Sequence, residues 1–222
     1  MTLEFPNENA AYRAARDELL DAEADLRQRT EEVAAMRRAL PPGGEVPQDY
    51  LFHDMAGRPV RFSDLFADGQ DTLALYSFMV GTDETAPCPM CTGLVDALDG
   101  AAPHIRARIG LEVGIGGSST QAAQVTAARG WKHIRALSFA GTDYNRSYHG
   151  ESPDGAQWPM LNVFQRGDGV IRHFWATELF AREWSGHPRH MDPAWPLWTF
   201  LDWSPAGRGD FFPALRYGNV DP

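Results

Sequence analysis

Residues 72–91 read TLALYSFMVGTDETAPCPMC and hold both cysteines of this 222-residue chain, Cys88 and Cys91. The opening TLALYSFMV is a short continuous apolar run with aromatic side chains, which is typical of a strand buried on both faces. The residues that follow, CTGLVDALDGAAPHIRARI, have the character of a helix. The stretch therefore predicts a buried strand that leads into a helix, with the two cysteines at the junction.

The spacing of the two cysteines fits thiol–disulfide chemistry. If Cys88 lies at the helix N-terminus, unpaired backbone N–H groups and the positive end of the helix dipole favour its thiolate. Cys91 then lies one turn deeper on the same face. The pair predicts an exposed attacking thiolate and a shielded resolving thiol, which can close an intramolecular disulfide.

The cysteine pair has other possible interpretations. A zinc site needs about four ligands, so histidines such as His53, His187 and His190 would have to complete it. Covalent haem requires C-x-x-C-H, and Thr92 stands in the place of that histidine. A redox-silent structural pair stays open, although stable disulfides are uncommon in reducing compartments. We expect no metal and no tightly bound cofactor.

The segments around the cysteines predict an α/β fold with a mixed central sheet. Apolar runs alternate with helical stretches that have Ser or Thr starts and glycine stops. Two hairpins are indicated, one turning at Gly57 and one at RGDG. A last helix is expected from Asp192, with Pro193 at its first position. The expected strands lie at 72–80, 110–117 and 135–139, the second hairpin at 158–177, and helices at 91–109 and 118–131.

The N-terminal segment predicts a long helix outside the sheet domain. Within residues 8–40, nine positions alternate steps of three and four, which is a heptad pattern. PPGG at 41–44 ends the pattern. We expect a helical arm at 1–44 and a second domain at 45–222. The arm would either form a homodimer or lie along its own domain. The pattern comprises Tyr12, Ala15, Leu19, Ala22, Leu26, Arg29, Val33, Met36 and Leu40.

Charge and composition limit the partners. The formal net charge of −10 argues against nucleic acid or an anionic membrane as the main partner. No basic segment followed by an apolar stretch opens the chain, and no apolar run reaches the ~18 residues that a membrane span needs. We expect a cytoplasmic protein that binds neither nucleic acid nor membrane.

Several segments resemble known families. GRPVRFSDLF, followed by TLALYSFMV and a cysteine, resembles the opening of thioredoxin-like peroxiredoxins and thiol reductases. Across nearly its full length the chain resembles the thioredoxin-like family called domain of unknown function 899. The segments that carry this second resemblance are YRAARDELLDAEADL, MRRALP, YSFMVG, CPMC, RGWKHIRALSFAGTDYNRSYHG and LDWSPAGRGD.

The resemblance implies further site residues. Thioredoxin-like folds place a cis-proline before the strand that faces the cysteines, and Pro159 is the matching residue. Peroxiredoxins carry P-x-x-x-T-x-x-C, whose threonine helps place the peroxide; Thr85 matches it, with Gly81 where the proline would be. From its type alone, Arg146 is a candidate to supply positive charge to a thiolate.

These observations predict a thiol–disulfide oxidoreductase or thiol peroxidase on a thioredoxin-like fold. Cys88 would attack a disulfide or hydroperoxide substrate, Cys91 would resolve the product to a redox-active disulfide, and a cellular thiol reductant would restore the dithiol. The alternative is a redox-silent binding or assembly protein that keeps the fold and works through its helical arm.

Overall fold

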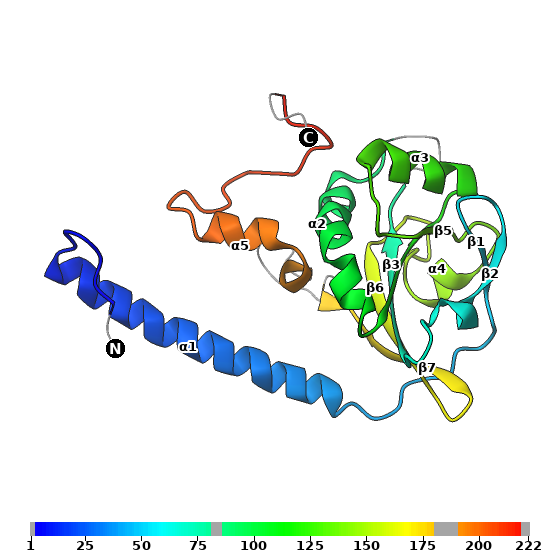
Figure 1. The fold of residues 1–222 in the computed structure, drawn as a ribbon, viewed down its shortest axis with the longest axis horizontal. Coiled ribbons are helices and arrows are strands. Elements are labelled where there is room, and N and C mark those ends of the chain that lie inside the picture. Colours follow the sequence, from blue (N-terminus) through cyan, green and yellow to red (C-terminus); the bar gives the residue numbers. More distant parts are fainter. Residues whose placement is uncertain (1–2, 81–85, 180–190, 219–222) are drawn as a thin grey trace. The chain divides into compact units, whose positions relative to one another are not determined.

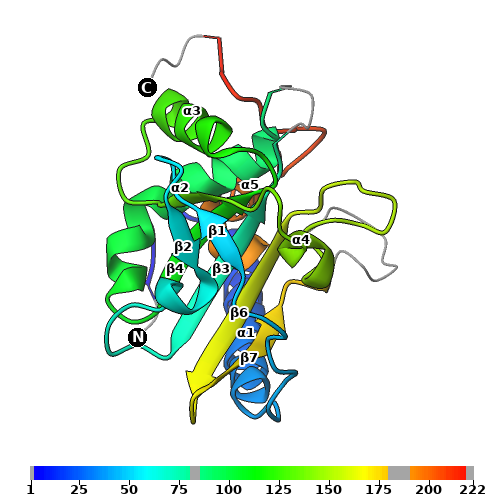
Figure 2. The same ribbon diagram turned by 90° about the vertical axis from the view of Figure 1, so that its right-hand side faces the viewer.

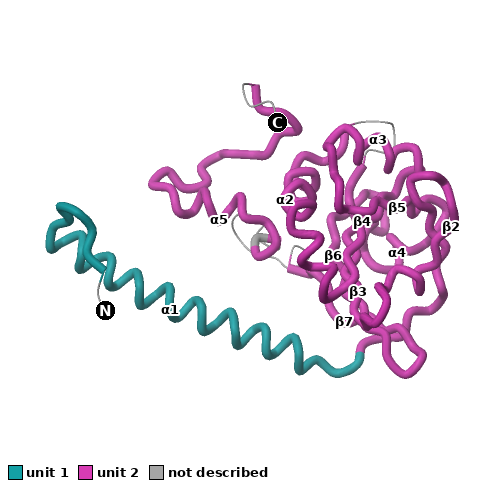
Figure 3. Tube along the Cα trace, in the orientation of Figure 1, with its two compact units in different colours: residues 1–42 teal, residues 43–222 magenta. Residues whose placement is uncertain are grey.

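The computed structural model describes residues 3–80, 86–179 and 191–218 (Figure 1). The chain divides into two compact units, residues 1–42 and residues 43–222 (Figure 3). In the described residues, no helix is both long and apolar enough to cross a membrane.

The first unit contains the helix α1, Ala10–Arg38. The Asn9 side chain caps its start by accepting a hydrogen bond from the Tyr12 N–H at 2.9 Å. Arg37 and Arg38 occupy the last turn, where positive charge complements the helix dipole. The long N-terminal helix predicted from the heptad pattern is therefore confirmed.

The second unit is built on a mixed sheet. In the described part of the chain, seven strands lie in the order β2-β1-β5-β4-β3-β6-β7. The strand β3 pairs in parallel with β4 and antiparallel with β6, and β6 and β7 form an antiparallel hairpin (Figure 2). The strands are β1 Leu51–His53, β2 Pro59–Arg61, β3 Thr72–Phe78, β4 Gly110–Ile115, β5 Ala136–Ser138, β6 Met160–Gly167 and β7 Val170–Ala176.

Helices cover this sheet on both faces. Figure 1 shows α2 on one side of the sheet and α4 on the other. A parallel β–α–β unit followed by an antiparallel hairpin and a helix is the thioredoxin-like arrangement, so the predicted fold class is confirmed. The helical elements are η1 Phe62–Leu65, α2 Pro89–Arg106, α3 Ser119–Arg129, α4 Tyr144–Ser147, η3 Asp192–Ala194 and α5 Pro196–Asp202.

Side chains of the central strand β3 pack into two separate hydrophobic cores. Successive side chains of a strand point to opposite faces, so Ala74, Tyr76 and Phe78 face one core. That core is completed by α2, α3 and α5. Leu73 and Leu75 face the other core, which is rich in aromatic rings from β1, η1 and α4. Burial on both faces explains why this strand reads as a continuous apolar run.

The last helix begins later than predicted. Asp192–Ala194 forms a short 3-10 turn, and the α-helix α5 starts at Pro196 with Trp195 as its N-cap residue. Pro196 suits the first helical position as well as Pro193 does, because neither has an N–H to leave unpaired. The second proline of the segment therefore starts the helix.

Candidate functional site

Cys88 is the N-cap residue of α2. Its backbone is extended, with φ −57° and ψ 124°, and Pro89 occupies the start of the helix. The Cys88 N–H donates to the Met79 carbonyl at 3.1 Å, and its carbonyl accepts the Thr92 N–H and hydroxyl, both at 2.9 Å. These bonds fix the first turn of α2 against the end of β3. The predicted junction of buried strand, cysteine and helix is present.

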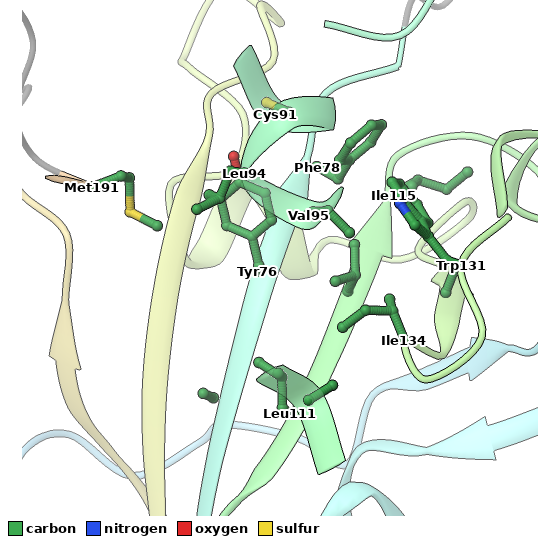
Figure 4. Packing of buried hydrophobic residues seen from close by; sticks show 14 of the residues in the cluster. Tyr76, Phe78, Cys91, Leu94, Val95, Leu111, Ile115, Trp131, Ile134 and Met191 are labelled. Atoms are coloured by element: carbon green, nitrogen blue, oxygen red, sulfur yellow. The ribbon is translucent and has the colours of Figure 1, made fainter. Parts of the chain in front are cut away.

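The two cysteines differ in exposure. Cys88 is half-buried, whereas Cys91 lies one turn into α2 with 1 % of its surface exposed, and both are free thiols. Figure 4 shows Cys91 at the start of α2, above the ring of Tyr76 from β3. A half-open cysteine beside a shielded one is the arrangement that attack followed by resolution requires.

Hydrogen bonds lower the pKa of Cys88 to about 6. The largest cause is a hydrogen bond from the Cys91 thiol, and the backbone N–H groups of Cys91 and Met90 add to it. Partial burial works in the opposite direction. The Cys88 thiolate therefore sits at the N-terminus of α2, where unpaired N–H groups and the helix dipole favour negative charge.

The same hydrogen bond raises the pKa of Cys91 well above its ordinary value. Donating to Cys88 is the largest cause, followed by burial and the negative charge on Cys88. Hydrogen bonds from the Tyr76 hydroxyl and the Met79 backbone act against this rise. The two pKa shifts therefore favour a thiolate on Cys88 and a proton on the buried sulfur of Cys91 at neutral pH.

Gln157 holds the backbone of Val80, just beyond the end of β3. Its side-chain oxygen accepts the Val80 N–H at 2.8 Å, and its amide group donates to the Val80 carbonyl. A hollow of about 690 Å³ is lined by Val80, Ala86 and Pro87 and by side chains of α3. The volume of the hollow is within the range of small-molecule sites. One of its lining residues, Pro87, directly precedes Cys88 in the sequence.

The peptide bond before Pro159 differs from the one expected from the sequence. The Trp158–Pro159 bond is trans, so the predicted cis bond is wrong. Trans is the more stable isomer, and the chain before Pro159 is already held, because the Trp158 N–H donates to the Gly150 carbonyl at 2.9 Å. Pro159 is half-buried and precedes Met160, which pairs with Ser77 in β3. It therefore lies at the end of β3 from which the chain continues to the cysteines.

The other predicted site residues lie elsewhere or outside the described residues. Arg146, in α4, is exposed and pairs with Glu151 at 3.3 Å. Thr85 falls outside the described residues, as do His187 and His190. His53 lies in β1. Within the described ranges, no group of three or more His, Cys, Asp or Glu side chains is placed to hold a metal.

Sequence reasoning missed Tyr76 and Gln157. A signal for Tyr76 was present: the alternation of β3 puts Ala74, Tyr76 and Phe78 on one face, and a buried tyrosine hydroxyl requires a polar partner. That the partner is the Cys91 sulfur follows only from how α2 crosses the strand. No sequence pattern pointed to Gln157, because its partner Val80 lies 77 positions away in the chain.

The fold and the cysteine pair together define a thioredoxin-like α/β protein with two neighbouring thiols at the end of a central strand. The chain belongs to the family described as "Bacterial protein of unknown function (DUF899)", whose model matches residues 2–218. Comparison with curated proteins found no match.

Solved structures that are similar to the chain include peroxiredoxins and thiol peroxidases. A mutant of PrxQ from Xylella fastidiosa has a TM-score of 0.47 at 12% identity, covering 69% of this chain and 92% of its own. A peroxiredoxin-like protein from Aquifex aeolicus has a TM-score of 0.42 at 11% identity, covering 62% and 75%. A thiol peroxidase from Chromobacterium violaceum has a TM-score of 0.40 at 14% identity, covering 62% and 75%.

Proposed function

We propose that this protein is a thiol–disulfide oxidoreductase, reductase-like or peroxidase-like, that uses Cys88 and Cys91. The observation that carries the proposal is the placement of a half-buried Cys88 at the N-terminus of α2, one turn from a fully buried Cys91. Hydrogen bonding lowers the pKa of Cys88 to about 6, and the pKa of Cys91 is raised well above its ordinary value. At neutral pH most Cys88 is thiolate, the nucleophilic form of cysteine.

With a disulfide substrate, the Cys88 thiolate attacks one sulfur, and the other sulfur leaves as a thiolate. Cys91 then loses its proton and attacks Cys88, which closes the Cys88–Cys91 disulfide and releases the second substrate thiolate. The substrate gains two electrons, and the cysteine pair loses them. A cellular dithiol reductant reverses the oxidation of the pair and is itself oxidised.

With a hydroperoxide, the Cys88 thiolate attacks the terminal oxygen, and the O–O bond breaks to give an alcohol or water. The resulting Cys88 sulfenic acid condenses with the Cys91 thiol, forming the same disulfide and releasing water. The half-exposed Cys88 and the hollow beside Pro87 support access for either kind of substrate.

In this proposal the thiolate is stabilised mainly by Cys91 and the backbone of α2, and Arg146, which is exposed and paired with Glu151, stays a candidate to supply positive charge. Pro159 is proposed to shape the wall of the site, and Thr85 keeps the peroxide-placing role that the resemblance implies. We further propose that the protein works as a homodimer in the cytoplasm, with the apolar positions of α1 as part of the contact.

Turnover assays with matched variants test the proposal. Hydrogen peroxide, an alkyl hydroperoxide and an insulin-type disulfide are each supplied with a dithiol reductant. We expect turnover of at least one, loss of all reaction in Cys88→Ser, and a trapped adduct on Cys88 in Cys91→Ser. Equal reactivity of the two single variants toward a thiol probe would contradict the assignment of roles.

A further inference from the structure

The phenol of Tyr76 is buried in the same core cluster as Cys91, the inner member of the cysteine pair. Tyr76 has 1 % of its surface exposed, and burial followed by its interaction with Cys91 raises the pKa of its hydroxyl well above the ordinary value. Figure 4 shows the ring standing up from β3, with its oxygen turned toward the first turn of α2. A tyrosine so deep in an apolar core otherwise incurs the desolvation cost of its hydroxyl without compensation.

The backbone of Tyr76 is fixed from both sides. It lies in the middle of β3, opposite Val113 in the parallel neighbour and Leu161 in the antiparallel neighbour. The centre of the sheet therefore sets the position of the Tyr76 ring relative to α2. The Tyr76 hydroxyl can approach the Cys91 sulfur from one direction only. This rigidity is what a group that stabilises charge on a reacting atom requires.

We propose that Tyr76 is a positioning residue for Cys91 that stabilises the negative charge developing on its sulfur when Cys91 resolves the Cys88 adduct. The inference rests on the proposed function and assigns the second step of that reaction to a strand residue. In the described part of the chain, the titratable groups acting on Cys91 are Cys88 and Tyr76, and the Met79 backbone supplies one further hydrogen bond.

The role is specific to the second step. Before reaction, Cys88 carries the negative charge and Cys91 keeps its proton. Once Cys88 is bound to a substrate sulfur, its charge is gone and Cys91 must give up its proton to attack. The Tyr76 hydroxyl then donates to a sulfur that is becoming a thiolate, and hydrogen bonds to charged groups are stronger than neutral ones.

Dithiobisnitrobenzoate separates the two steps, because each releases one coloured thiolate. The Cys88 thiolate attacks the aromatic disulfide, forming a mixed disulfide and releasing the first nitrothiobenzoate. Cys91 then attacks Cys88, forming the internal disulfide and releasing the second. Stopped-flow absorbance on the full-length reduced protein gives both rates across a range of pH.

Tyr76→Phe keeps the ring and removes only the hydroxyl. We expect the second release to slow by roughly tenfold, as the loss of one hydrogen bond to a charged group implies. Its pH midpoint should move upward, while the first release stays within about twofold of wild type. The matched control is Tyr144→Phe, which removes a hydroxyl from a tyrosine equally buried in the other core. It should leave both releases unchanged.

If Tyr76→Phe fails to fold, 3-fluorotyrosine at position 76 replaces it. The fluorine makes the hydroxyl a stronger donor, so the pH midpoint of the second release should move downward. A folded Tyr76→Phe protein with a wild-type second release and pH profile would overturn this inference and leave the proposed function standing. A wild-type protein that releases no second nitrothiobenzoate would overturn both.

Discussion

At the scale of single residues, the pairing of Cys88 with Cys91 explains how two chemically identical side chains differ. Cys88 accepts hydrogen bonds and Cys91 donates one, so the pKa of Cys88 falls and that of Cys91 rises. The helix N-terminus adds backbone donors on the Cys88 side. The Cys91 thiol, more than the backbone N–H groups of Met90 and Cys91, therefore lowers the pKa of Cys88.

Cys91→Ala removes this stabiliser without adding a polar group. The pKa of Cys88 should then rise from about 6 toward its ordinary value, because the first and largest cause of its depression is gone. Alkylation by iodoacetamide, followed from pH 5 to pH 9 (about the range that brackets both values), measures the midpoint. In wild type, the rate should rise through pH 6 and then level off.

Cys91→Ser is the conservative partner of this variant, since a serine hydroxyl can still donate to Cys88. Its alkylation midpoint should lie between those of wild type and Cys91→Ala. If Cys91→Ala keeps the wild-type midpoint, the thiolate owes its stability to the backbone of α2 alone, and the account of the pair is wrong.

The sequence indicated this pair but not its details. Spacing and the apolar run before it were enough to predict a more exposed Cys88 and a shielded Cys91, and the attacking role of Cys88 stays a prediction. The partners Tyr76 and Gln157 depend on how β3, α2 and the segment before β6 meet in space, which no local pattern encodes. Pro159 was expected to be cis by resemblance, and the structure places it trans.

At the scale of elements, strand β4 and the aromatic ring of Phe139 approach each other closely at Gly114. A Cβ built on Gly114 in β4 would lie 1.6 Å from the Phe139 ring. That ring packs 4.4 Å from Phe52 and 4.8 Å from Tyr144, centroid to centroid, so it has no room to withdraw. Glycine at position 114 is therefore required by packing and not by backbone conformation.

Gly114→Ala should lower the free energy of unfolding by about 3 kcal/mol or more, because overpacking forces buried rings apart. Urea unfolding followed by circular dichroism measures the loss. Gly100→Ala, in the interior of α2, is the matched control: nothing lies within 4 Å of its Cβ, so it should stabilise the helix by about 0.5–1 kcal/mol. Similar small effects of both variants would contradict this packing.

Elements marked by turn residues were predictable. Gly57 and Gly169 have positive φ angles of 77° in the two hairpins that the sequence indicated, and Gly130 ends α3 in the left-handed conformation. The start of α5 was not predictable from the sequence, because Pro193 and Pro196 are equally suited to the first position of a helix. Tertiary packing of Trp195 against Gly93 of α2 accompanies the later start.

At the scale of the whole molecule, α1 keeps apolar side chains on its surface. No residue of the helix is buried, and Leu26 and Met36 of the heptad pattern are 68% and 62% exposed. The ion pair Arg13–Asp17 lies on the same helix outside this pattern, whereas Arg29, the one charged residue of the pattern, pairs with Glu32. Exposed apolar residues at heptad spacing are the pattern that coiled coils bury.

We therefore expect the full-length protein to sediment as a dimer. Leu19→Lys combined with Leu26→Lys places charge at two heptad positions and should shift the protein to a monomer in sedimentation equilibrium. Leu20→Lys is the control, because Leu20 is 44% exposed on the same helix but lies outside the pattern. A wild-type protein that remains monomeric at all practical concentrations would remove the dimer from this account.

We propose that Cys88 and Cys91 form a redox-active pair. Its most direct test is a redox titration of the full-length protein against mixtures of reduced and oxidised glutathione, with the state of each cysteine read by mass spectrometry after alkylation. We expect one two-electron transition between a dithiol and an internal Cys88–Cys91 disulfide, reversed by dithiothreitol. Two thiols that stay reduced throughout, or that form only separate glutathione adducts without closing a disulfide, would contradict it.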